Sequence, residues 1–291
     1  MHPAPSVIVF TALSGLGFGL LIWLGLGFPA VTGVTAFAFF FIAYALSVGG
    51  LISSVFHLGN PRNAIYSFSQ WRTSWLSREG IIAIATLLTF APYAIGTIFF
   101  DTVIPALGVI GAILAIITVF CTSMIYGQLK TIPRWSMPLT PVLFLLYAIS
   151  GGALLSGEVK VAGVLIFVLT ALQIAAWMMG DGRFSGSGSD KGTATSLGSL
   201  GKVRLLETAH TSRNYILDEM VHIIGRKHSQ KLRVIATVFL GALPVSLLQV
   251  LPASHMSAFL ALASHIVGLF ASRWLFFAEA EHVVGLYYTR G

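Results

Sequence analysis

Two side chains that can exchange protons stand on either side of one predicted connection in this chain of 291 residues. His57 closes one apolar run in the sequence FHLGNPR, and Glu79 opens the next in the sequence SWLSREG. An imidazole titrates near neutral pH, and a carboxylate can relay a proton from water. A quinone uses both groups, because its carbonyl oxygens accept hydrogen bonds and its reduction consumes electrons and protons together. The pair therefore predicts a quinone site.

Both residues also have a purely structural interpretation. A carboxylate near the start of a helix is stabilised by the positive end of the helix dipole, and Glu79 could pair with Arg78 or Arg62. His57 could simply hydrogen-bond the connecting segment. The spacing leaves both interpretations open. In the functional one, Arg62 and Arg78 help to orient the bound quinone.

The sequence predicts no metal site in this chain. Cys121 is the single cysteine, whereas an iron–sulfur cluster or a structural zinc site needs several ligands of this kind. His255 and His265 lie at and within the last apolar run, but nothing pairs either with a second histidine, so haem is not expected. Arg273, in the same run, is expected to pair with Glu279 or with a carboxylate of another helix.

The composition excludes a soluble protein. Hydrophobic residues make up 56% of the chain and charged residues only 9%, with a mean hydropathy of +0.87, whereas soluble domains carry about 25% charged residues. The formal net charge of +7 does not indicate nucleic acid, because the basic residues gather in a few connections between apolar runs. The lipid bilayer is the expected environment.

Eight apolar runs are long enough to cross a membrane as helices, for which about 20 residues are needed. The sequence thus predicts an all-α polytopic protein, a bundle of eight transmembrane helices that forms a single membrane-anchor domain over residues 1–291. The predicted spans are 6–28, 34–56, 79–100, 105–125, 139–156, 159–180, 233–251 and 256–278.

Basic residues predict the orientation of these spans. The connections after the second, fourth and sixth spans hold 14 of the 17 Lys and Arg residues, and the positive-inside rule places such connections in the cytoplasm. We expect Lys160 and Arg290 on the opposite side and both chain termini outside the cytoplasm. His57 and Glu79 then lie at the cytoplasmic face.

The connection 181–232 is the longest and divides into two parts. Residues 181–202 are rich in Gly and Ser, which is typical of a flexible linker. Residues 204–225 alternate apolar and charged side chains, which favours an amphipathic helix on the membrane or on a partner protein. The spacing does not decide between these two surfaces.

The two motifs around His57 and Glu79, HLGNPR and SWLSRE, resemble those of a known family. They are similar to motifs in the membrane anchor subunits of dimethyl sulfoxide reductase-type molybdenum enzymes, and the predicted eight spans extend the likeness over nearly the whole chain. The resemblance implies quinone binding (ubiquinone or menaquinone) by His57 and Glu79. It also implies two partner subunits, one with molybdopterin and one with iron–sulfur clusters, in a bacterial inner membrane.

The opening sequence MHPAPSVIVFT is similar to one branch of that family, the anchors of cytoplasmic quinone-linked sulfite dehydrogenases, as is the region of Tyr215 and GRKH at 225–228. This likeness and the expected cytoplasmic position of Glu79 favour sulfite oxidation, with the partner subunits on the cytoplasmic face. Three alternatives stay open: an anchor that oxidises quinol for a dimethyl sulfoxide or polysulfide reductase, a structural tether without a quinone site, and a secondary transporter.

Overall fold

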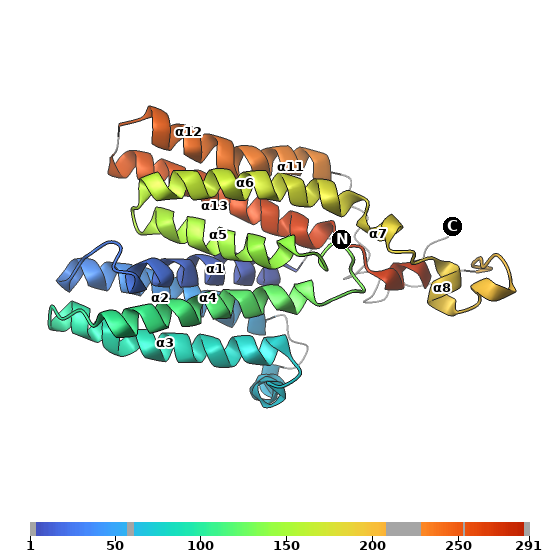
Figure 1. Cartoon of the computed structure of the whole chain (residues 1–291), viewed down its shortest axis with the longest axis horizontal. Coiled ribbons are helices and arrows are strands. Elements are labelled where there is room, and N and C mark those ends of the chain that lie inside the picture. Colours follow the sequence, from blue (N-terminus) through green and yellow to red (C-terminus); the bar gives the residue numbers. More distant parts are fainter. Residues whose placement is uncertain (1–3, 57–60, 208–227, 253, 288–291) are drawn as a thin grey trace.

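The computed structural model describes residues 4–56, 61–207, 228–252 and 254–287. In these ranges every regular element is a helix and no strand occurs. The long helices lie alongside one another in a single bundle (Figure 1). The prediction of an all-α protein with several membrane-spanning helices is confirmed.

Seven segments of the described chain are long and apolar enough to cross a membrane. They are α1 (Pro5–Gly25), α2 (Gly33–Val55), α3 (Trp75–Phe99), α4 (Pro105–Gly127), α6 (Val159–Asp181), Ser229–Val250 and α13 (His255–Ala278). The segment Ser229–Val250 consists of α11 (Ser229–Thr237), a π-helical turn η3 (Val238–Ala242) and α12 (Leu243–Val250) without a break. The remaining predicted span is α5 (Leu139–Leu155), whose 17 residues rise about 26 Å along the helix axis.

Helix α1 forms the centre of the bundle. It packs against α2, α4, α5 and α13, and its glycines permit close approach. A methyl group on Gly17 would overlap the backbone of Ser47 in α2, and one on Gly19 would overlap the carbonyl group of Ala148 in α5. Gly15 and Gly27 have open space instead. Close helix packing therefore depends on Gly17 and Gly19, and not on every glycine in this part of the chain.

The two ends of the bundle differ in the length of their connections. At one end, which we call the long-loop end, α2, α4 and α6 finish and α3, α5 and α11 begin. The other end carries the short turns 26–32, 100–104, 156–158 and 251–254. The short 3₁₀ helix η1 (Pro61–Gln70) precedes α3 at the long-loop end.

Both described chain ends also lie at the long-loop end (Figure 1). Helix α1 starts there, and after α13 the chain returns to the connection 128–138, where the Val283 amide donates to the Thr131 carbonyl over 3.0 Å. The expectation that the termini lie opposite the long basic connections is therefore wrong. A chain that traverses a bundle an even number of times finishes on the side where it began, so connections after even-numbered spans share the side of the termini. Arg290 lies outside the described residues.

The connection after α6 contains short helices rather than only linker. They are α7 (Arg183–Gly186), α8 (Lys191–Thr195) and η2 (Gly198–Leu200), and the 3₁₀ helix η4 (Val283–Tyr287) contacts α8. Asp190 caps α8 by accepting a hydrogen bond from the Thr193 amide at 2.7 Å. The predicted amphipathic helix over 204–225 lies largely outside the described residues.

Candidate functional site

Glu79 lies one turn inside α3 rather than at its start. The helix begins four residues earlier than predicted, because the Ser74 hydroxyl accepts a hydrogen bond from the Ser77 amide and caps the first turn. The side chain of Glu79 is 3% exposed and accepts a short hydrogen bond from the Thr122 hydroxyl of α4. Glu79 therefore faces the neighbouring helix and does not act as the cap of its own.

The Thr122 hydroxyl has two acceptors within hydrogen-bond distance. The Thr122 hydroxyl carries one hydrogen, and it lies within reach of both the Glu79 carboxyl and the Thr118 carbonyl, the latter at 3.1 Å. The hydroxyl can donate to an ionised Glu79. Alternatively it donates to Thr118 while a protonated Glu79 donates to the Thr122 oxygen. Thr122 thus serves both protonation states of Glu79, which is what a group that takes up and releases a proton requires.

Arg78 does not pair with Glu79 in the described structure. Its guanidinium donates to the carbonyls of Trp71 at 2.9 Å and Arg72 at 2.6 Å, and it stacks on the Trp75 ring with 4.4 Å to the ring centroid. Consecutive helical residues point about 100° apart, so the inward direction of Glu79 turns Arg78 outward. Arg78 fixes the turn that leads into α3.

The segment before α3 packs beside Glu79. A methyl group added to Gly80 would lie 2.8 Å from the Phe68 ring of η1, so this glycine lets η1 approach α3 closely. His57 and the side chain of Arg62 lie outside the described residues. Sequence reasoning placed the end of the second span and the start of the third at one face, and the described ends of α2 and α3 do share the long-loop end. The proximity of His57 to Glu79 stays a prediction.

A cluster of four charged residues at the long-loop end was not predicted. Arg134, from the connection before α5, bonds Asp181 at 2.6 Å and Glu279 at 3.1 Å. Arg233 of α11 bonds Glu279 at 2.7 Å and Asp181 at 2.8 Å. The cluster ties together the ends of α6 and α13, the start of α11 and one connection. No short-range sequence pattern could have found it, because every partner comes from a distant part of the chain.

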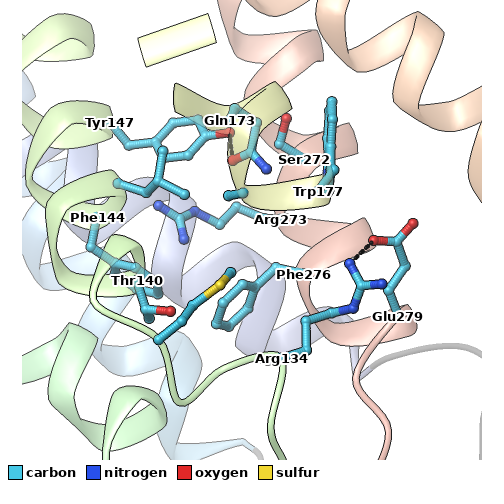
Figure 2. A pocket seen from close by; sticks show the side chains of 13 residues that line it. Arg134, Thr140, Phe144, Tyr147, Gln173, Trp177, Ser272, Arg273, Phe276 and Glu279 are labelled. Atoms are coloured by element: carbon cyan, nitrogen blue, oxygen red, sulfur yellow. Dashed lines mark hydrogen bonds and ion pairs between the residues drawn. The ribbon is translucent and has the colours of Figure 1, made fainter. Parts of the chain in front are cut away.

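Arg273 does not have the carboxylate partner that the sequence led us to expect. Glu279 is occupied by Arg134 and Arg233, and Arg273 instead stacks on two rings of α5, with 4.0 Å to the Phe144 centroid and 4.3 Å to the Tyr147 centroid. Six residues of helix separate Arg273 from Glu279, which points them roughly 120° apart around the axis. The expected pair is therefore wrong, and Arg273 faces the inside of the bundle (Figure 2).

The histidine considered for haem, His265, is fully buried beside the π-helical turn. Its Nδ1 lies 3.0 Å from the Leu240 carbonyl, and the Ser264 hydroxyl donates to the Phe239 carbonyl at 2.9 Å. A π-helical turn leaves backbone carbonyls without their usual helical donors, so these two side chains of α13 satisfy η3. Among the described residues, no three His, Cys, Asp or Glu side chains form a group that could hold a metal ion.

Comparison with known proteins gives two matches that cover nearly the whole chain. A family model described as "DMSO reductase anchor subunit (DmsC)" matches residues 1–278. The C subunit of sulfite dehydrogenase from Allochromatium vinosum is 30% identical over 99% of this chain and 99% of its own length. No solved structure matches the chain.

Proposed function

Because this chain belongs to the family of DMSO reductase anchor subunits, we propose that it holds a molybdenum enzyme at the membrane and transfers electrons from sulfite oxidation to quinone. The anchor family implies association with catalytic subunits. In the proposal, one of these carries molybdopterin and oxidises sulfite, and another carries iron–sulfur clusters. Sulfite as the substrate is supported by the likeness to a sulfite dehydrogenase subunit over the full chain length.

The observation that carries the quinone assignment is the buried carboxyl group of Glu79 with its Thr122 partner. A carboxyl group in this setting can hold a proton and pass it to a quinone oxygen at the membrane edge. The cavity on the inner side of Thr122 is only about 10 Å³, which is room for about one water molecule. The quinone ring would therefore approach from the side of η1, which packs on α3 at Gly80. His57 and Arg62 would complete the site there, and Arg78 holds the adjoining turn.

The proposal also includes the finer topology. All eight helical segments cross the bilayer, with α5 as the shortest, in a bacterial inner membrane. The long-loop end, with its basic connections and both described chain ends, faces the cytoplasm according to the positive-inside rule. The partner subunits dock at that end, close to Glu79, because electron tunnelling to quinone requires a short gap.

The test uses the complex purified in mild detergent through a tag on this chain. We expect molybdenum and iron to co-elute and the complex to reduce a water-soluble quinone with sulfite as the electron donor. Glu79→Gln should preserve the metal content and slow quinone reduction strongly. Glu158→Gln, the same change at the short-turn end of the bundle, is the matched control and should leave the rate unchanged.

Three results would each contradict part of the proposal. If the chain elutes without metal, under conditions that keep related complexes intact, the proposed anchor function is wrong. If the Glu79→Gln and Glu158→Gln complexes reduce quinone at equal rates, the proton role proposed for Glu79 is wrong. Quinol-dependent reduction of a sulfoxide or polysulfide without sulfite oxidation would instead reverse the direction of electron flow.

A further inference from the structure

Arg273 is a buried cation inside the bundle. It lies five residues before the end of α13 and is 3% exposed. Its guanidinium extends from α13 toward the Phe144 and Tyr147 rings of α5 (Figure 2). Aromatic faces attract a cation but carry no negative charge that would neutralise it.

No carboxylate forms an ion pair with this cation in the described part of the chain. Its Nε atom is buried without a partner, and Arg273 takes part in no ion pair there. The acid that lies on the same helix end, Glu279, is shared by Arg134 and Arg233, and these two arginines balance Glu279 and Asp181 in charge. A buried charge without a counter-charge is strongly destabilising, so a missing negative group is expected next to Arg273.

A cavity of about 30 Å³ adjoins the guanidinium. Besides the ion pair of Arg134 and Glu279, its polar lining consists of hydroxyl and amide side chains, from Thr140, Tyr147, Gln173 and Ser272. The Tyr147 hydroxyl donates to Gln173 Oε1 at 2.9 Å, which leaves the Gln173 amide hydrogens for the cavity. The Thr140 hydroxyl is already used in a bond to the Trp135 carbonyl at 2.7 Å, and the Ser272 side chain lines the same space (Figure 2). The Gln173 amide and the Ser272 hydroxyl can therefore donate hydrogen bonds to a small anion beside Arg273.

We propose that this cavity binds one small monovalent anion of halide size, such as chloride, on Arg273. A single negative charge matches the single unbalanced positive charge. The volume has room for one such ion, and the apolar walls of Leu143 and Phe276 favour an ion that sheds its water readily. The bound anion links α13 to α5 and α6 through Arg273 and Gln173. The proposed anion site does not depend on the proposed quinone function, although Arg273 also lines the small cavity beside Thr122.

Chloride binding and chloride-dependent stability test the proposal. The purified protein, with any subunits that co-purify, is dialysed against radiolabelled chloride, and its thermal midpoint is followed as chloride replaces gluconate at constant ionic strength. We expect about one chloride per chain and a midpoint that rises and then saturates. Arg273→Gln should bind none and show no chloride response. Lys160→Gln, which removes a charge at the short-turn end, should respond like the unaltered protein.

A second variant keeps the test decisive if Arg273→Gln fails to fold. Gln173→Glu retains the acceptor for Tyr147 and supplies a carboxylate to the same cavity, so it should be stable without chloride and should no longer bind it. Absence of bound chloride in the unaltered protein would show that only water fills the cavity. Protection by sulfate but not by chloride would overturn the assigned size and charge. If chloride raises the thermal midpoint of Gln173→Glu as much as that of the unaltered protein, chloride binds at a different site.

Discussion

Removing one hydroxyl group from α4 tests whether Glu79 handles a proton. Thr122→Val keeps the shape of the side chain but deletes the group that bonds the Glu79 carboxyl. A hydrogen bond to a charged group contributes about 1.5–3 kcal/mol. If that bond supports Glu79 during quinone reduction, its loss should slow turnover by about 10- to 100-fold, since about 1.4 kcal/mol corresponds to a factor of ten.

The same helix pair offers a matched control. Thr118 of α4 contacts Thr86 of α3 at 3.1 Å, and both side chains are fully buried. Thr118→Val removes a hydroxyl from the same interface, away from Glu79, and should cost about 1 kcal/mol of stability with turnover unchanged. Thr122→Ser keeps a hydroxyl and should retain most of the rate.

The assay measures sulfite-dependent quinone reduction and thermal stability on the same purified complexes. We expect both valine variants to unfold at lower temperature than the unaltered complex, and only Thr122→Val to lose turnover. If the Thr122→Val complex turns over as fast as the Thr118→Val complex, the hydroxyl only joins two helices, and the proton role assigned to its contact with Glu79 is refuted.

Two further predictions concern the packing and the charges of the bundle. Gly19→Ala should destabilise the protein by about 1–3 kcal/mol through overpacking. Gly15→Ala should be neutral or stabilising, because no neighbouring atom lies within 4 Å of the added methyl group. Equal midpoints of the two variants in thermal unfolding would argue against the close packing at Gly19. Glu279→Gln leaves two arginines with one acid between them and should cost about 3 kcal/mol, while Asp181→Asn, at a side chain that is 47% exposed, should cost less. A larger loss for Asp181→Asn in the same measurement would show that burial does not govern this cluster.

Hydropathy predicted the helices of this fold well, because a helix in lipid must satisfy its backbone internally and cover it with apolar side chains. The predicted boundaries differ where a cap or a turn decides them, as Ser74 does for α3. The side of the termini was mispredicted for another reason. The side on which the termini lie depends on the number of times the chain crosses the bundle and not on any single residue. The basic residues predicted only which connections lie on the same side.

Of the contact between Glu79 and Thr122, the sequence indicated only Glu79. The position of Glu79 near a membrane edge follows from its place at the start of an apolar run. Its partner Thr122 is 43 residues away, and one threonine among many carries no signal. Arg273 was recognisable as an unusual residue in a membrane span, but its surroundings depend on how α5 and α13 face each other, which periodicity does not predict.

The central position of α1 has a consequence for how the protein is made. In α1, 72% of the most apolar stretch is enclosed by protein, compared with 22–50% in the other segments long enough to span the membrane. Its neighbours α5 and α13 are synthesised much later. Helix α1 leaves the ribosome before α5 and α13, so the surface of α1 around Gly19, which packs on α5, stays in contact with lipid until α5 is inserted. A chain truncated after α4 would therefore expose the surface of α1 that faces α5 to quality-control proteases.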